Sequence, residues 1–207
     1  MTYLIGLTGN IATGKSLVAR MLGSLGAHVI DADALVHQLQ RKGTLVWAGI
    51  VGVFGDGILR ADGEIDRAKL GALVFSDPEA LHRLESIVHP AVGAEIERQL
   101  ANLEPPGQVV VIEAIKLIEA GLHKRCDTLW VVTSRPEVQL KRLMRTRGLS
   151  EVDAQVRIAA QPPQSEKAAL ADVVIENDTT VSDLRAQVER QWGRVQVAAH
   201  RQGASQP

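Results

Sequence analysis

The amino-acid sequence predicts an α/β protein, a parallel sheet flanked by helices. Short apolar runs at residues 3–7, 109–112 and 128–132 alternate with longer segments in which apolar residues recur every three or four positions. Such alternation of strands and helices is typical of a parallel sheet covered on both faces. Runs that are apolar at nearly every position suit central strands buried on both sides.

The composition is that of an ordinary globular protein. The chain has 207 residues, of which 45% are hydrophobic and 23% are charged, and these proportions allow one sizeable core. The formal net charge is −1, from 23 basic and 24 acidic residues. A dedicated nucleic-acid binder carries a marked basic excess, so we expect no nucleic-acid partner.

The single cysteine, Cys126, excludes an intrachain disulfide and fits a reducing compartment. A buried apolar role is favoured over a nucleophilic one, because free cysteines are usually buried. The first residues lack the basic region and apolar stretch of a signal peptide, and no window approaches the ~20 apolar residues that span a bilayer. We therefore expect a cytoplasmic protein with no membrane partner.

The first half of the chain begins with a strand at residues 3–7, a glycine-rich turn and a helix that starts at Lys15. A second strand is predicted at residues 27–30 and ends at Asp31. From residue 34 to about residue 103 the periodicity is helical. A helix at residues 78–88 is expected to be cut by His89 and Pro90, because proline disrupts helix interiors.

The second half opens after a break at residues 105–107, with sequence Pro-Pro-Gly. Strands are predicted at residues 109–112, 128–132 and 173–175. An arginine-rich helical stretch, residues 137–167, separates the last two strands, and an amphipathic helix follows at residues 181–192. Polar residues end several of these strands, which is where open parallel sheets bind ligands.

Residues 9–16, with sequence GNIATGKS, match the P-loop pattern G-x-x-x-x-G-K-[ST] at every fixed position. Gly9 and Gly14 let the backbone turn so that successive N–H groups face an anion, and Lys15 adds a positive charge near the β- and γ-phosphates. The Ser16 hydroxyl is a candidate Mg²⁺ ligand. The helix that follows directs its positive end at the phosphates. The loop predicts binding of ATP with Mg²⁺.

Three carboxylates follow predicted strands. Asp31 and Asp33 could be turn or cap residues, since aspartate is favoured in both roles. Phosphoryl transfer to an alcohol needs a carboxylate that accepts the hydroxyl proton, and beside a phosphate loop we predict Asp33 for that task. Asp31 would support it or lie in the Mg²⁺ water shell. Glu113 lies where a Walker B acid would hold a metal-bound water or substrate hydroxyls; the alternative is an exposed strand-end residue.

Basic residues gather between positions 141 and 157. They could simply form a solvated helix face. In P-loop kinases, however, an arginine-bearing lid commonly closes over the transferring phosphate, and Arg142 and Arg147 are the predicted catalytic arginines. His89 is either part of a helix break or a contact for an anionic substrate.

Several segments together resemble the dephospho-CoA kinase family. The resemblance extends from Leu4 to about Arg190. The opening GLTGNIATGKS at residues 6–16 is similar to the family's G-L-T-G-x-I-x-S-G-K-S, and residues 31–33 fall where the family has D-A-D. The later elements follow in the family's order: Leu84 with His89-Pro90, Arg157-Ile158, Gln161, Lys167, Ala171-Asp172 and Ile175-Glu176-Asn177.

The resemblance implies transfer of the ATP γ-phosphate to the ribose 3′-hydroxyl of dephospho-CoA, giving CoA and ADP with Mg²⁺. By position, Asp33 becomes the base and Asn177 lies near the adenine. ATP would be bound by six consecutive residues: Ala12, Thr13, Gly14, Lys15, Ser16 and Leu17. Three positions depart from the family pattern: residues 113–119 read EAIKLIE where D-x-P-L-L-x-E is usual, Thr146 replaces a common arginine, and Asp178 replaces a small residue.

The predicted architecture is therefore a P-loop NTPase-type parallel sheet with an inserted helical substrate lobe and a lid. We predict one domain over residues 1–199, with a nucleotide core at residues 1–34, 107–135 and 168–195. The substrate lobe covers residues 35–105 and the lid residues 136–167. Residues 200–207 are expected to be a disordered tail, because terminal polar segments are often poorly ordered.

Two other functions compete with this interpretation. A P-loop kinase could instead act on a nucleoside monophosphate or a sugar acid. A guanine-nucleotide switch is disfavoured, because none of the three asparagines precedes a lysine as the guanine motif N-K-x-D requires, and no D-x-x-G occurs. The sequence does not indicate an oligomeric state.

Overall fold

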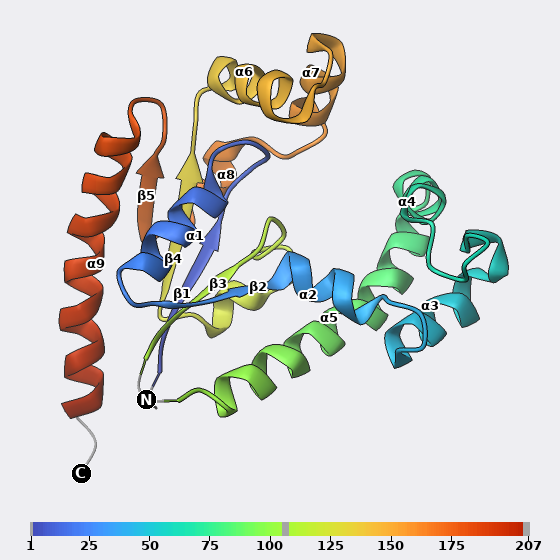
Figure 1. The fold of residues 1–207 in the computed structure, drawn as a ribbon, viewed down its shortest axis with the longest axis horizontal. Coiled ribbons are helices and arrows are strands. Elements are labelled where there is room, and N and C mark those ends of the chain that lie inside the picture. The colour runs from blue at the N-terminus through green and yellow to red at the C-terminus, as the bar shows by residue number, and fades with distance from the viewer. Residues whose placement is uncertain (1, 105–107, 205–207) are drawn as a thin grey trace. The chain divides into compact units, whose positions relative to one another are not determined.

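The computed structural model describes residues 2–104 and 108–204. The chain divides into two compact units, which we call the sheet unit (Met1–Asp31 and Leu103–Pro207) and the helical unit (Ala32–Asn102). The predicted substrate lobe, residues 35–105, differs from the helical unit by three residues at each end, and residue 105 lies outside the described residues. Figure 1 shows the elements of both units.

The sheet unit is built on five parallel strands, as predicted. Their order across the sheet is β2-β3-β1-β4-β5. Each expected strand is present, and most extend by one residue beyond the predicted end. The strands are β1 (Tyr3–Thr8), β2 (His28–Asp31), β3 (Val109–Glu113), β4 (Thr128–Thr133) and β5 (Val173–Glu176).

The register brings the carboxyl ends of the strands together. Glu113 of β3 is paired with Leu7 of β1 on one side and with Asp31 of β2 on the other. The chain moves from β1 to one edge of the sheet and later crosses to the other side of β1, so the topological switch lies between β1 and β3. Ligands of open α/β sheets bind at such a switch.

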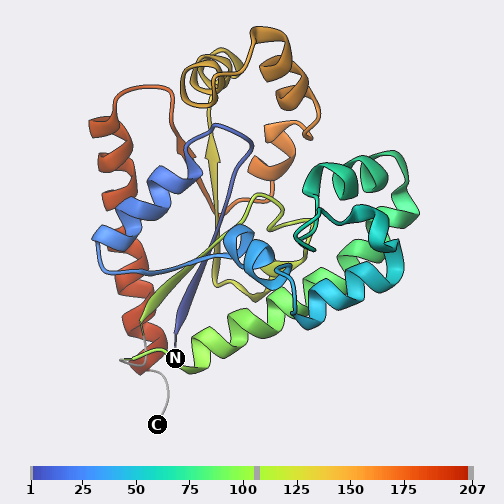
Figure 2. The same cartoon turned by 45° about the vertical axis from the view of Figure 1, so that its right-hand side comes forward.

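Helices pack against the sheet and bury its strands. Helices α1 and α9 lie side by side against one face (Figure 2), where they enclose a core that includes Leu7, Leu22, Trp130 and Val188. The remaining helices follow β3 and β4 in the chain. The helices of this unit are α1 (Lys15–Ser24), η2 (Leu122–Arg125), α6 (Pro136–Arg147), α7 (Glu151–Ala159), α8 (Gln164–Ala168) and α9 (Val181–Ala204).

Helix α9 is longer than the sequence indicated. The expectation of disorder from residue 200 is wrong for residues 200–204, which are helical. Two contacts explain the extension: Val195 is buried at 4% exposure, and the Gln202 side chain donates a 2.7 Å hydrogen bond to Asp127 Oδ1. Residues 205–207 of the predicted tail lie outside the described residues.

The helical unit packs around a separate apolar core formed by Ile50, Ile58, Leu70 and Ile96, among others. Side chains cap three of its helices: Thr44, Asp66 and Asp77 accept hydrogen bonds from the first backbone N–H groups. The elements are α2 (Ala32–Leu39), α3 (Leu45–Phe54), η1 (Asp56–Ile58), α4 (Arg67–Ser76) and α5 (Pro78–Ala101).

Helix α5 does not break at His89 and Pro90, contrary to the prediction. It continues for 24 residues with Pro90 in its interior. Proline in a helix interior costs about 3 kcal/mol, but Val88, Val92 and Ile96 are buried on both sides of it. Burial of one such side chain contributes about 1.5–3 kcal/mol, so packing offsets the cost of the proline.

Helices α5 and α9 contain 24 residues each, a length that is sufficient to span a bilayer. Both have charged residues throughout their sequences. In residues 2–104 and 108–204, no helix combines this length with enough apolar character to cross a membrane.

Candidate active site

The phosphate loop lies between β1 and α1. Gly14, which caps α1, has φ 98° and ψ 19°, and Ala12 has φ 59°. These left-handed conformations turn the backbone so that N–H groups line a concave surface suited to an anion. The N-terminus of α1 has no side-chain cap and no acidic residue in its first turn. The positive end of the helix dipole is therefore available to phosphate.

The two fixed glycines are required by close packing. A Cβ atom on Gly9 would lie 2.5 Å from the carbonyl oxygen of Val132, and one on Gly14 would collide with the amide of Asn177. Gly14 also has a positive φ that other residues adopt only with strain. The structure thus explains both glycines in physical terms.

Lys15, Ser16 and Glu113 converge at the switch between β1 and β3. Lys15 Nζ lies 2.7 Å from Glu113 Oε1, and Ser16 Oγ donates a 2.6 Å hydrogen bond to the same oxygen. Lys15 is 8% exposed and Glu113 4% exposed. Glu113 is therefore not the exposed strand-end residue of the alternative interpretation, because its carboxylate contacts the phosphate loop.

The side-chain oxygen atoms at this point are suitable ligands for Mg²⁺. Magnesium prefers oxygen ligands and usually keeps waters and substrate phosphates in its shell, so that one or two protein oxygens suffice. Ser16 Oγ and Glu113 Oε1 supply such oxygens. The described residues contain no group of three or more His, Cys, Asp or Glu that could hold a metal on their own.

Arg142 of α6 contacts the phosphate loop through its carbonyl oxygens. Its guanidinium donates to Ala12 O and Thr13 O, each at 3.2 Å, and to Asn177 O at 2.8 Å. Burial lowers the pKa of this guanidinium, an effect that Asp178 opposes and Arg145 reinforces. Arg142 thus braces the backbone of the loop.

Asn177 is buried at 5% exposure directly after β5. Its side-chain Nδ2 donates a 2.7 Å hydrogen bond to Thr13 O, and its backbone N–H bonds to Thr133 O at 2.9 Å. The residue links the end of the sheet to the phosphate loop. Its predicted place near the adenine stays a prediction.

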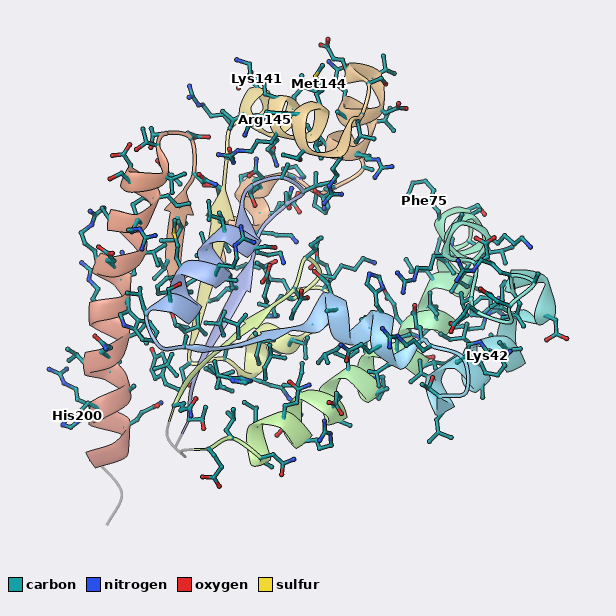
Figure 3. The ribbon with its side chains drawn as sticks, viewed as in Figure 1. Lys42, Phe75, Lys141, Met144, Arg145 and His200 are labelled. Atoms are coloured by element: carbon teal, nitrogen blue, oxygen red, sulfur yellow. The ribbon has the colours of Figure 1, made fainter. Side chains whose placement is uncertain are left out.

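Arg147 behaves differently from Arg142. It lies in the last turn of α6, where its side chain is exposed. Among the described residues it forms no hydrogen bond or ion pair with the loop. Lys141, Met144 and Arg145, labelled in Figure 3, lie along the same helix. The structure brings Arg142 to the loop and leaves Arg147 in solvent.

Side-chain amides that were not predicted tie the loop to the segment around α6–α8. Ile11 N–H donates to Gln161 Oε1 at 2.6 Å, Gln139 Nε2 donates to Ile11 O at 2.7 Å, and Asn10 Nδ2 donates to Pro162 O at 2.8 Å. Gln161 belongs to the family pattern noted in the sequence. A glutamine on an arginine-rich helix gives no such signal, which is why Gln139 was missed.

Lys167 is a second buried cation near the strand ends, at 5% exposure. Its ammonium donates to Ile115 O at 2.6 Å and lies 3.1 Å from Glu119. The Thr8 hydroxyl donates to the same carbonyl at 3.0 Å. These bonds hold the segment after β3, in which this chain lacks the proline that is usual in the family.

Asp178, another departure from the family pattern, has a structural role. Its carboxylate accepts hydrogen bonds from Ser134 Oγ at 2.9 Å and from Arg135 N–H at 2.7 Å. Arg135 is the N-cap residue of α6. A carboxylate at a helix N-terminus is favourable, so Asp178 supports the start of the helix that carries Arg142.

The other predicted residues are distributed between the units. Asp31 ends β2 in the sheet unit and is exposed. Asp33 lies in the first turn of α2, and His89 lies within α5; both belong to the helical unit and are partly exposed. Their roles stay predictions.

Comparison with known proteins identifies the family. A family profile described as dephospho-CoA kinase matches residues 3–183. The chain belongs to the dephospho-CoA kinase family. Among curated relatives, a dephospho-CoA kinase of Symbiobacterium thermophilum is 49% identical over 91% of this chain and 80% of its own length, and that of Geobacter sulfurreducens is 47% identical over 92% and 98%.

Solved structures agree with this assignment. The crystal structure of TT1252 from Thermus thermophilus has a TM-score of 0.79 and 34% identity over 93% of this chain and 97% of that one. A dephospho-CoA kinase from Campylobacter jejuni has a TM-score of 0.68 and 29% identity, with 94% and 98% covered. The predicted family, the P-loop kinase fold and the class of ATP-dependent kinase are thus confirmed.

Proposed function

We propose that this chain phosphorylates the ribose 3′-hydroxyl of dephospho-CoA with the γ-phosphate of ATP, which yields CoA and ADP. The observation that carries the proposal is the convergence of Lys15, Ser16 and Glu113 at the sheet switch in a chain of this family. A nucleoside monophosphate or sugar acid is a less favoured acceptor, since the relatives carry the name of dephospho-CoA kinase.

ATP would bind along the phosphate loop. Backbone N–H groups of residues 12–17 would face its phosphates, and Lys15 would exchange Glu113 for the β- and γ-phosphate oxygens. Asn177 and the segment after β5 would lie beside the base. Catalysis of phosphoryl transfer rests on such positioning and charge neutralisation.

Ser16 and Glu113 would contribute to the Mg²⁺ site, Ser16 as a direct ligand and Glu113 through metal-bound water. When bound with ATP, the ion neutralises charge on the β- and γ-phosphates. The protein's part is to hold these two oxygens in place, which the 2.6 Å hydrogen bond between them already does.

Asp33 would be the general base. It would accept the proton of the ribose 3′-hydroxyl as that oxygen attacks the γ-phosphorus and ADP departs. Asp31 would orient Asp33 or a metal-bound water, and His89 would contact the anionic acceptor. The helical unit would bind the acceptor.

The segment of residues 136–167 would act as the lid. Arg147, which is exposed at the end of α6, would be free to approach the transferring phosphate when the segment moves. Arg142 of α6 would act from its place against the loop, whose backbone carbonyl groups it contacts. We also propose a cytoplasmic location, which the lone cysteine supports because an intrachain disulfide is impossible.

A substrate screen tests this function. The protein would be mixed with ATP and Mg²⁺ and with dephospho-CoA, nucleoside monophosphates or gluconate, and ADP release would be followed. We expect turnover with dephospho-CoA and formation of CoA. Turnover with another acceptor but none with dephospho-CoA would contradict the proposal, and GTP hydrolysis without an acceptor would favour a switch protein.

A further inference from the structure

The helical unit contains a basic hollow lined only by residues of that unit. It has a volume of about 400 Å³. We call it the arginine hollow. Its charged lining comes from the end of α2, the segment before α4 and the first turn of α4: His37, Arg41, Arg60, Glu64, Asp66 and Arg67.

The backbone around the hollow is held by hydrogen bonds. Residues 59–65 form a tight turn in which Arg60 N–H donates to Glu64 O at 2.9 Å, and Leu59 and Ile65 form an antiparallel bridge. Lys42, labelled in Figure 3, joins the end of α2 to this turn through its ammonium, which donates to Asp62 O at 2.9 Å. Buried Ile65 lies beneath the turn. The walls are therefore fixed by the fold.

The two carboxylates of the hollow are already engaged. Asp66 caps α4 and accepts from the N–H groups of Ala68 and Lys69. Glu64 accepts a hydrogen bond from Lys42 N–H at 3.1 Å. Neither forms an ion pair within 4.0 Å with an arginine of the hollow in the part of the chain that the structure describes, so the carboxylates do not cancel the arginine charges by direct contact.

The arginines keep their donors for a ligand. Arg60 has only a loose 3.7 Å pairing with Asp62, and both side chains are more than half exposed. Within the described ranges, the side chains of Arg41 and Arg67 form no hydrogen bond or ion pair. Guanidinium groups in this state match phosphate oxygens in a bidentate manner.

Arg67 directly follows Asp66, the residue whose carboxylate caps α4. It is the first residue of α4, a helix of 10 residues that has no acidic residue in its first turn. The Asp66 carboxylate accepts hydrogen bonds from the Ala68 and Lys69 N–H groups and offsets the positive end of the helix dipole. An anion bound in the hollow would therefore be held by the arginine side chains and not by the N-terminus of α4.

The hollow also lies at the right place relative to the proposed base. His37 follows Asp33 by four residues on α2, so the two side chains share one face of the helix about one turn, 5.4 Å, apart. In dephospho-CoA the ribose carries the 3′-hydroxyl and, through C5′, the diphosphate. The spacing between these two groups is comparable with one helical turn.

We propose that the arginine hollow binds the 5′-diphosphate of the acceptor, with Arg41 and Arg67 as its main ligands. The proposal rests on the proposed function and adds a binding site to it. Recognition of the diphosphate would favour dephospho-CoA over acceptors that have a ribose hydroxyl alone. It would also let Asp33 meet the 3′-hydroxyl of a substrate that is already anchored.

The test compares Arg41→Ala and Arg67→Ala with the matched variant Arg83→Ala, an exposed arginine of α5 outside the hollow. Steady-state rates would be measured with dephospho-CoA and with adenosine, which has the 3′-hydroxyl but no diphosphate. We expect the KM for dephospho-CoA to rise about 10- to 100-fold in each hollow variant, as for a lost charged hydrogen bond. The KM for ATP and the rate with adenosine should stay within twofold of the unsubstituted protein.

Several outcomes would overturn the inference: an unchanged KM for dephospho-CoA, an equal loss with adenosine, or an equal effect of Arg83→Ala. Partial rescue by Arg67→Lys, together with an unchanged Tm, would separate ligand binding from misfolding. If the unsubstituted protein does not turn over dephospho-CoA, the proposed function fails. Calorimetric titration with dephospho-CoA would then still test whether the arginine hollow binds this ligand. An affinity of the hollow variants equal to that of the unsubstituted protein would disprove the inference.

Discussion

The phosphate loop and the arginine hollow bind anions by different means. In the loop, Lys15 is buried, pairs with Glu113 at 2.7 Å and stands on a backbone that Arg142 and Asn177 hold in place. In the hollow, Arg41 and Arg67 are exposed on a fixed frame. In the loop, contacts within the protein fix the positions of the side chains. In the hollow, they fix only the backbone.

This difference matches the two tasks. Stabilising a transition state requires charges that are already oriented, because reorganisation at the moment of reaction is costly. Anchoring a substrate tolerates side chains that settle after the ligand arrives. Substitutions in the loop should therefore lower kcat, and substitutions in the hollow should raise KM.

Replacement of the loop cation should have the largest effect. We expect Lys15→Ala to lower kcat/KM by about 10³-fold or more, because the positioned charge on the phosphates is lost. Rates of ADP release would be compared with those of Lys124→Ala, an exposed lysine of the same unit. A loss of less than tenfold would show that the buried cation is not decisive.

Replacement of the proposed base should come next. Asp33→Asn should lower kcat by about 10²-fold or more while ATP affinity stays nearly constant, since an amide cannot accept the proton. Asp56→Asn, an exposed aspartate in the same unit, serves as the control in kinetics and in ATP titrations. A kcat within a few-fold of the unsubstituted protein would remove Asp33 from the mechanism.

A conservative change tests the bracing of the loop. Arg142→Lys keeps the charge but cannot reach all the carbonyl oxygens that the guanidinium bonds. We expect the KM for ATP to rise about tenfold and the Tm to fall, because buried carbonyls lose their partners at a cost of about 1–3 kcal/mol. The exposed Arg147→Lys should leave the Tm unchanged. Equal thermal stability of the two variants would argue against the bracing role.

The smallest effect concerns the packing beneath β1. Burial raises the pKa of the Cys126 thiol to about 12 from an ordinary value of 9.0, with a further contribution from Asp127. Because the folded state holds the thiol in its neutral form, this form's contribution to the free energy of unfolding is complete below pH 9. The contribution is lost as the pH rises from 9 towards 12. Urea unfolding at pH 8 and pH 10.5 should show a larger alkaline loss for the unsubstituted protein than for Cys126→Ala. Equal losses would contradict this.

Short sequence patterns were sufficient to predict the strands, the phosphate loop and the carboxylates at the strand ends. The strands are apolar runs, the loop is a contiguous motif, and the carboxylates follow strand ends, so β1, β3 and Glu113 were found where expected. A parallel sheet then brings these ends together whatever the intervening sequence.

The remainder depends on contacts between distant residues. Gln139 and Ile11 are 128 positions apart, and Arg142 and Ala12 are 130 apart, so no local pattern relates them. Helix α5 continues past Pro90 because it packs against neighbouring helices of its unit. The arginine hollow joins residues before α3 to residues around α4, and the charge pattern alone resembles an ordinary solvated surface.

The pair formed by Lys15 and Glu113 has a consequence for selectivity. Before nucleotide arrives, an internal carboxylate already occupies the ammonium group, so any incoming anion must compete with it. A lone inorganic phosphate or sulfate offers little in exchange, whereas a metal-bound triphosphate brings many oxygens for the lysine and a cation for the glutamate. We therefore expect a lone phosphate or sulfate to compete less well for Lys15 than a metal-bound triphosphate does.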